Sequence, residues 1–335
     1  MHVQIEISNL SVGYKNRSST ELLLSEVNSN VHAGELIAVI GRNGTGKSTL
    51  IRTLCGLQAP IGGNIILDGN DYNSYNLMEK ARKISFVSTE IIQLNHMRVI
   101  ELVALGRHPY TGWFGNMDRA DIDIINSAID SVGLASMAEE FMNQISDGER
   151  QRAMIARALA QDTGILLLDE PTAFLDILHR HELVHLLYTL TRKEKKTIIF
   201  STHDLQIAMD VADRIWLLNE QKLVQGAPED VMLSGDLARI YNGENYSFDE
   251  QNISLVLKKE SSGKIGLTGG TERYRELTRK TLNRAGWEVT SEKDIVPGVR
   301  IETDGDKPVW FLQNKSGKIQ LKSLYELSLH IDHKS

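Results

Sequence analysis

The sequence predicts an α/β fold with a largely parallel sheet, followed by a small α+β domain. In the first 240 residues strand-like and helix-like segments alternate, as they do where helices connect parallel strands. The strand-like segments are continuous apolar runs, which is typical of strands buried on both faces. Beyond Tyr241 the segments become shorter and a polar stretch, 242–245, reads as a linker. We therefore expect two domains, 1–240 and 245–335.

The expected elements of the first domain follow this alternation. Strands are predicted at Leu36–Ile40, Ile65–Leu67, Ile84–Val87, Ile165–Leu168, Thr197–Phe200 and Arg214–Leu218. Helices are predicted at Lys47–Leu54, Gly148–Ala160, Leu178–Leu190 and Leu205–Val211. The stretch between the third and fourth strands, about 94–145, is too long for a plain crossover, and Val99–Leu105 and Arg119–Val132 read as helices. We expect an inserted helical subdomain over about 94–160.

The C-terminal domain reads as short strands around one helix. Strands are predicted at Ile253–Leu257, Lys264–Leu267, Val299–Glu302 and Val309–Leu312, and a helix at Thr271–Ala285. The helix follows Gly266-Leu267-Thr268-Gly269-Gly270, which resembles a phosphate-binding loop. No Lys or hydroxyl residue stands at the position that such a loop requires, so we expect a glycine-rich turn.

Composition limits the classes of partner and site. The net charge is −7, from 37 Lys and Arg against 44 Asp and Glu, which argues against nucleic acid or an anionic membrane surface as the main partner. Cys55 is the only cysteine, so neither an intramolecular disulfide nor a Cys-based zinc cluster can form. No apolar run approaches the ~20 residues that span a bilayer. We expect a cytoplasmic protein that reaches any membrane through a partner.

A phosphate-binding motif lies between the first predicted strand and helix. The pattern G-x-x-x-x-G-K-[ST] is matched by Gly41-Arg42-Asn43-Gly44-Thr45-Gly46-Lys47-Ser48, and Thr49 follows it on the helix. Glycines let the backbone approach phosphate oxygens, and the helix N-terminus presents N–H groups to the anion. Lys47 is expected to neutralise the β- and γ-phosphates, and the Ser48 hydroxyl to coordinate Mg²⁺. The motif predicts ATP and Mg²⁺ as cofactors.

Two further strand ends carry candidate catalytic groups. The apolar run Ile165–Leu168 ends in Asp169 and Glu170. In a nucleotide site the first acid holds Mg²⁺ and the second is placed to polarise the attacking water. His203 follows the apolar run at 197–200 and could donate a hydrogen bond to the γ-phosphate. Acids at a strand end, and single histidines, are common for structural reasons, so these assignments depend on the phosphate loop.

A third motif identifies a family that the chain resembles. Residues Ile145-Ser146-Asp147-Gly148-Glu149-Arg150-Gln151-Arg152 are similar to the L-S-G-G-E/Q signature of the ATPase subunits of ABC transporters. In the same order, Tyr14 matches the aromatic residue that stacks on adenine, 173–176 the D-loop with Asp176, and His203 the switch histidine. The resemblance covers about residues 3–240 and implies a P-loop NTPase core of ABC type.

The resemblance also implies an assembly. Two ATPase subunits pack head to tail around two ATP molecules, and Ser146 and Gly148 donate hydrogen bonds to the γ-phosphate held by the opposite subunit. Glu149 of the same signature is a further expected nucleotide-binding residue. In the family the region around Thr89–Arg107 receives the membrane permease. The segment 102–110, with Leu-Gly-Arg-x-Pro-Tyr, looks like the ATPases of iron–siderophore, haem and cobalamin importers. We therefore expect a homodimer bound peripherally to permease subunits on the cytoplasmic side, linked indirectly to an external substrate-binding protein.

The sequence departs from the family at two positions. Thr89 stands where the Q-loop glutamine, which contacts Mg²⁺ and the attacking water, is expected. Asp147 replaces the first signature glycine and brings a negative charge near a phosphate unless its side chain turns outward. Since Lys47, Asp169 and Glu170 are retained, we still expect an active ATPase with modified coupling.

Two alternative functions stay open from the sequence. One is a soluble ABC ATPase that acts in translation or DNA repair, although its acidic charge and single phosphate loop argue against that role. The other is an ATPase regulated by ligand sensing through the C-terminal domain. That domain could also provide dimer contacts or stabilise the main domain.

Overall fold

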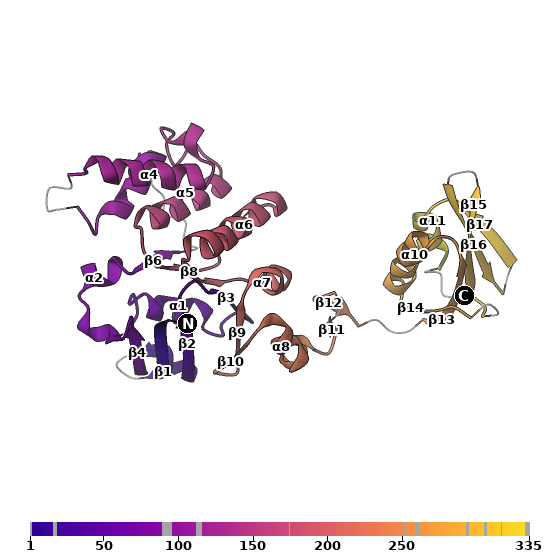
Figure 1. The fold of residues 1–335 in the computed structure, drawn as a ribbon. Helices are drawn as coiled ribbons and strands as arrows, with labels where there is room; N and C mark the ends of the chain where they lie inside the picture. The colour runs from indigo at the N-terminus through magenta and orange to yellow at the C-terminus, as the bar shows by residue number, and fades with distance from the viewer. Residues whose placement is uncertain are drawn as a thin grey trace. The chain divides into compact units, whose positions relative to one another are not determined.

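The computed structural model describes residues 2–15, 19–88, 96–111, 116–173, 175–250, 252–258, 262–292, 295–304, 307–315 and 317–331. The chain forms two compact units, one of Met1–Asn242 with Phe248–Leu255 and the other of Gly243–Ser247 with Val256–Ser335 (Figure 1). In the ranges described, no helix has both the length and the apolar character needed to cross a membrane.

The first unit is built on a six-stranded sheet with the order β10-β9-β3-β8-β7-β6. Its strands are β3 (Leu36–Gly41), β6 (Ile84–Val87), β7 (Ile165–Leu168), β8 (Thr197–Ser201), β9 (Arg214–Asn219) and β10 (Lys222–Gly226). All neighbours pair in parallel except β10, which is antiparallel to β9 at one edge. The expected parallel sheet is confirmed.

The two faces of this sheet bury different cores. Leu36 and Ala38 of β3 face a core shared with the helices, while Ile37 and Val39 face a second core. The helices on or near the first face are α6 (Ile177–Glu194), α7 (Leu205–Val211), α8 (Pro228–Leu233) and α9 (Asp236–Tyr241). Such alternate burial is what the continuous apolar strands require.

The second core lies under an antiparallel sheet with the order β2-β1-β4-β5. Its strands are β1 (Val3–Lys15), β2 (Thr20–His32), β4 (Gly62–Leu67) and β5 (Asn70–Asp71), and α1 (Lys47–Leu54) contributes to the same core. The predicted strand at 65–67 therefore belongs to this sheet and not to the parallel one. A 3₁₀ turn at Tyr72–Ser74 and helix α2 (Leu77–Ala81) lead to β6.

The predicted insertion forms helices α3 (Val99–Ala104), α4 (Arg119–Ser131) and α5 (Asp147–Ala160), with 3₁₀ turns at Leu105–Arg107 and Ala135–Met137. Buried Arg107 joins them, because its Nε donates to Asp121 Oδ1 at 2.8 Å and its Nη1 to the Ala160 carbonyl at 3.0 Å. Ordinary helical spacing would place Leu105 on the core side together with Leu102. The side chain is instead 50% exposed, because the chain turns into a 3₁₀ conformation at this residue.

The second unit has a five-stranded sheet with the order β14-β13-β15-β16-β17. Its elements are β13 (Gly263–Gly269), α10 (Glu272–Arg284), β14 (Trp287–Thr290), β15 (Gly298–Asp304), β16 (Lys307–Asn314), β17 (Gly317–Leu321) and α11 (Leu324–Ile331). β13 pairs in parallel with β14 and β15, and the other pairs are antiparallel. A two-stranded hairpin of β11 (Tyr246–Asp249) and β12 (Ser254–Leu257) precedes this sheet. The expected α+β architecture is confirmed.

Candidate nucleotide site

The predicted phosphate loop connects β3 to α1. Gly44 and Gly46 adopt φ angles of 81° and 98°, which glycine reaches without strain. A Cβ atom at Gly41 would lie 2.6 Å from the Leu218 carbonyl oxygen, so the end of β3 has no room for a side chain. The glycines of the motif are therefore required both by the turn and by the neighbouring strand. The turn brings the chain directly to the N-terminus of α1.

Lys47, the first residue of α1, is buried at the base of this loop. Its Nζ donates to the carbonyl oxygens of Gly41 at 2.9 Å and Arg42 at 3.2 Å. Burial lowers the pKa of the Lys47 ammonium, while the carboxylates of Glu170 and Asp169 act in the opposite direction. The loop thus presents a positive charge next to backbone N–H groups, which is the arrangement that holds a phosphate.

Asp169 lies at the end of β7 and is almost completely buried. Its Oδ1 accepts hydrogen bonds from Ser48 Oγ at 2.9 Å and from Ser201 Oγ at 2.8 Å. Its backbone N–H donates to the Val87 carbonyl at 2.9 Å, so the neighbouring strand fixes its main chain. The structure therefore brings the predicted pair, Ser48 and Asp169, into direct contact.

This pair fits a magnesium ion. Hydroxyl and carboxylate oxygens are suitable ligands for Mg²⁺, which usually keeps waters and binds phosphate oxygens in addition to one or two protein groups. Within the residues that are described, no group of three or more His, Cys, Asp or Glu side chains could hold a metal ion. The two oxygens of Ser48 and Asp169 thus match a metal bound jointly with a nucleotide.

Glu170 and His203 meet beside the loop. Glu170 Oε1 and His203 Nε2 are within ion-pair distance. Glu170 has a φ of 48°, a left-handed conformation that is uncommon for a residue with a side chain. Its backbone N–H donates to Ser201 Oγ at 2.8 Å. The two predicted catalytic groups are therefore neighbours, and a serine of β8 supports the unusual main chain of one of them.

Ser201 is the residue of this site that the sequence prediction missed. It is fully buried, donates to the Asp169 carboxylate and accepts from the Glu170 N–H. It therefore links both acids to the strand that leads to His203. The available signal was a hydroxyl residue directly after the apolar run 198–200.

Tyr14 lies beside α1, with its Oη 3.2 Å from Thr49 Oγ1. The side chain is 48% exposed, so much of the ring is free to stack on a planar group. Tyr14 thus lies next to the phosphate loop, and its contact with adenine stays a prediction.

The signature residues form a helix N-terminus. Ser146 caps α5 in a reciprocal capping box with Glu149, whose Oε2 accepts from the Ser146 N–H at 2.7 Å. Hydrogen bonds from the Ser146 backbone and hydroxyl hold the pKa of Glu149 below its usual range. Asp147 pairs with Arg150 at 2.9 Å, so the charge that replaces the family glycine is balanced locally. Gly148 packs against Leu175, since a Cβ atom added at Gly148 would lie 3.2 Å from Leu175 Cδ2.

The remaining predicted residues either form no hydrogen bond or ion pair with the phosphate loop or lie outside the described residues. Asp176 caps α6 by accepting from the His179 N–H at 2.9 Å. In the residues described, no hydrogen bond or ion pair joins Ser146, Glu149 or Asp176 to the phosphate loop. Thr89, at the Q-loop position, and Phe174 of the D-loop lie outside the described residues.

The chain matches two family models. The model described as ABC transporter matches residues 24–173, and that described as iron ABC transporter C-terminal domain matches residues 262–332. An ABC transporter ATP-binding protein of Methanocaldococcus jannaschii is 36% identical over 73% of this chain and 84% of its own length. This chain belongs to the ATP-binding subunits of ABC transporters. As a member of that family it is an ATPase, and ATP is its substrate.

Other similar proteins carry more specific names. The ferric enterobactin transport ATP-binding protein of Escherichia coli is 38% identical to this ABC ATPase over 69% of the chain and 84% of its own length. The cobalamin import ATP-binding protein of Halobacterium salinarum is 34% identical over 84% of the chain and 71% of its own length.

Solved structures show the same fold. A chain of an inward-facing ABC transporter of the metal-chelate type has a TM-score of 0.62 at 28% identity, over 71% of this chain and 89% of its own. A dimeric cassette in a post-hydrolysis state with ADP and phosphate has a TM-score of 0.60 at 28% identity, over 67% and 98%.

Proposed function

We propose that this ABC ATPase is the energy-coupling subunit of an importer for iron chelates of the siderophore type. The observation that carries the proposal is the match of residues 262–332 to an iron ABC transporter C-terminal domain, on a chain whose nucleotide site is assembled. The relative that transports ferric enterobactin supports the same cargo class. Cobalamin is the second candidate cargo, because the relative named for its import is similar over 84% of the chain.

In the proposed mechanism the chain's own residues position the reactants. The phosphate loop and Lys47 hold the β- and γ-phosphates, and Ser48 and Asp169 hold Mg²⁺. When bound, Mg²⁺ neutralises charge that develops on the phosphate oxygens. Glu170 orients and polarises the attacking water, and His203, in contact with it, faces the γ-phosphate. Catalysis of this kind depends on positioning and charge stabilisation.

We further propose an ATP-dependent homodimer. In it Ser146, Gly148 and Glu149 of one subunit approach the γ-phosphate held by the other, and Asp176 lies at the same interface. Support comes from the dimeric cassette among similar structures and from the position of Ser146 at a helix N-terminus, where N–H groups attract an anion. Hydrolysis would then weaken the dimer and pass the change to the permease.

For the permease we propose the region 89–107 as the docking site, on the cytoplasmic side of the membrane. Of its described part, Leu105 presents an exposed apolar side chain, while Arg107 is buried and holds the helices together. Docking there would place the ATPase peripherally and link it, through the permease, to an external substrate-binding protein.

The test is affinity purification of the tagged protein from gently solubilised native membranes. We expect a many-helix permease to co-purify, and uptake of labelled ferric siderophore to require both proteins. If the protein supports uptake of cobalamin or haem instead, the proposed cargo is wrong but the proposed role in an importer stands. Recovery of only soluble partners with intact ATPase activity would contradict the importer and favour a non-transport ABC ATPase.

A further inference from the structure

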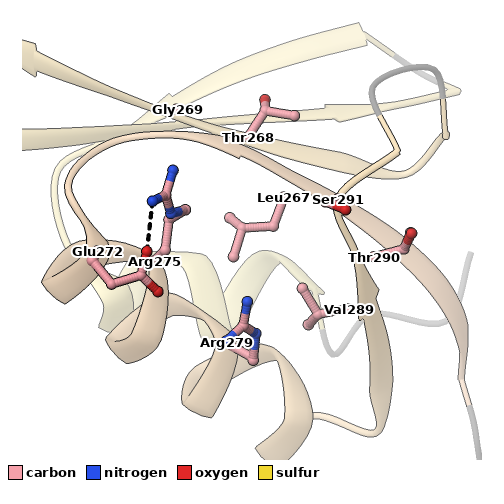
Figure 2. Close-up of a pocket in the computed structure, with 9 residues that line it drawn as sticks. All are labelled: Leu267, Thr268, Gly269, Glu272, Arg275, Arg279, Val289, Thr290 and Ser291. Atoms are coloured by element: carbon pink, nitrogen blue, oxygen red, sulfur yellow. Dashed lines mark hydrogen bonds and ion pairs between the residues drawn. The ribbon is translucent and has the colours of Figure 1, made fainter.

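A cavity of about 300 Å³ lies in the second unit, between α10 and the ends of two strands (Figure 2). It is lined by residues at the carboxyl ends of the parallel neighbours β13 and β14 and by one face of α10. Ligands of α/β proteins commonly bind at the carboxyl ends of parallel strands. The volume is within the range of small-molecule sites.

Two cations line this cavity from the helix. Arg275 and Arg279 are four residues apart, so both project from the same face of α10, as Figure 2 shows. Glu272 lines the cavity as well and pairs with Arg275 at 2.6 Å. In the part of the chain that the structure describes, Arg279 has no ion pair or hydrogen bond at its guanidinium. The charged side chains of the lining thus sum to an excess of one positive charge.

The pair between Arg275 and Glu272 leaves most of the arginine available. Both side chains are well exposed, and exposed pairs of this kind contribute little and are readily exchanged. A guanidinium has five N–H donors in a planar fork that matches a carboxylate or phosphate. An incoming anion can therefore bind Arg275 and Arg279 together without breaking a buried interaction.

The remaining lining suits a small organic anion. Thr290 and Ser291, at the end of β14, also belong to the lining. Leu267 and Val289 form an apolar wall. Two neighbouring arginines favour oxygen anions, and the apolar wall can contact a hydrocarbon part of the ligand.

An ordinary solvated helix face looks different on the same helix. Glu276 and Lys280 form an i,i+4 pair at 3.0 Å with both side chains exposed, and neither lines the cavity. These two charges balance each other, whereas the charged side chains that line the cavity sum to one positive charge in excess. Arg275 and Arg279 differ from that pair because both of them line a cavity.

We propose that this cavity binds a compact carboxylate or phosphate compound, with Arg275 and Arg279 as its anchoring cations. The site is separate from the nucleotide site and does not depend on the importer function proposed above. Such a ligand gives the C-terminal unit a binding role of its own.

The test measures binding of citrate and of inorganic phosphate to the full chain by isothermal titration calorimetry. Every protein carries Lys47→Ala, so that the nucleotide loop does not bind the probes. We expect saturable binding of at least one probe, weakened tenfold or more by Arg279→Gln and by Arg275→Gln. Preference for citrate would assign a polycarboxylate, and preference for phosphate a phosphorylated compound.

Lys280→Gln is the matched control, because it removes one positive charge from the same helix outside the cavity. We expect it to change affinity less than twofold, and thermal melts to show that all variants stay folded. If Lys280→Gln weakens binding of the probes as much as the arginine variants do, the effect comes from the net charge of the helix and the proposed site is wrong. Absence of saturable binding for both probes, or binding unchanged in both arginine variants, would also overturn it.

Discussion

In each unit a parallel strand runs through a glycine-rich turn into a helix. β3 continues through Gly44 and Gly46 into α1, and β13 through Gly269 and Gly270 into α10, with positive φ at all four glycines. The turns are locally alike, but the positive charges stand at different places. This difference decides what each turn can bind.

In the first turn the cation is the first residue of the helix and is buried against the loop's own carbonyls. A phosphate must enter the loop itself to reach Lys47, so the backbone shape selects the ligand. In the second, Arg275 and Arg279 stand one and two turns into α10, at an open cavity. At this cavity the arginine side chains select a ligand by its negative charge, and the shape of the ligand is less restricted.

The largest expected effect concerns the acid beside the first loop. Glu170→Gln should lower kcat for ATP roughly 10³-fold, because the amide cannot polarise the attacking water. ATP binding should persist, since Lys47 and Asp169 are unchanged. Steady-state ATPase assays and nucleotide-binding titrations measure the two quantities. Near-normal turnover would remove Glu170 from its proposed role.

A smaller effect is expected for the serine that supports both acids. Ser201→Ala should lower kcat roughly 10- to 100-fold with little change in KM for ATP, because Asp169 and Glu170 lose a common hydrogen-bonding partner. Ser85→Ala is the matched control, since Ser85 is a buried serine of β6 that bonds to Thr163 and not to either acid. An equal loss of kcat in both variants would indicate a general effect of core serines.

The buried ion pair of the helical subdomain should affect stability. Arg107→Met leaves Asp121 without its partner and should lower Tm by roughly 5 °C, measured by calorimetry. Arg98→Met, which breaks an exposed pair with Glu139, should lower Tm much less. A similar Tm for both variants would contradict the anchoring role of Arg107.

The same pair predicts a dependence on pH. The Arg107 guanidinium holds the pKa of Asp121 below its ordinary value of 3.8, so the pair stabilises the folded chain above that value. This stabilisation is lost as pH falls through the folded-state pKa. Acid denaturation should therefore be less steep in Arg107→Met than in the wild type, as circular dichroism at graded pH can show.

The smallest effect concerns the second turn. Glu272→Gln removes the carboxylate that competes for Arg275, so affinity for citrate should rise about two- to threefold. The measurement is the titration described above, in the same background. Weaker binding in this variant would mean that Glu272 takes part in holding the ligand.

The sequence predicts what is encoded locally. The phosphate loop is a contiguous motif, and the buried strands at 84–87 and 165–168 have the bounds that their apolar runs indicate. β1 and β2 were not predicted, because register shifts interrupt their pairing and break the alternation of apolar and polar residues along them. In strand 3–15 a two-residue period joins Ile5 to Ile7 and Leu10 to Val12, but the second pair is one residue out of phase because the register shifts between Ile7 and Leu10.

What the sequence could not provide are contacts between distant segments. Ser201 acquires its importance only when β8 lies next to β7, and Arg107 only when α4 and α5 surround it. Arg275 and Arg279 look in the sequence like solvated charges on a polar helix. Only the sheet beside α10 gives them a cavity to line.

The register between β7 and β8 determines both how the core packs and how the catalytic acids are held. Leu168 lies opposite Phe200, which places Asp169 beside Ser201 one residue later. A slip of one residue would turn the apolar side chains of β8 to the wrong cores and separate the acids from their serine at once. Mutations that shift the core are therefore selected against twice, for folding and for hydrolysis. Among related proteins, we expect substitutions in these two strands to be of kinds that preserve the register.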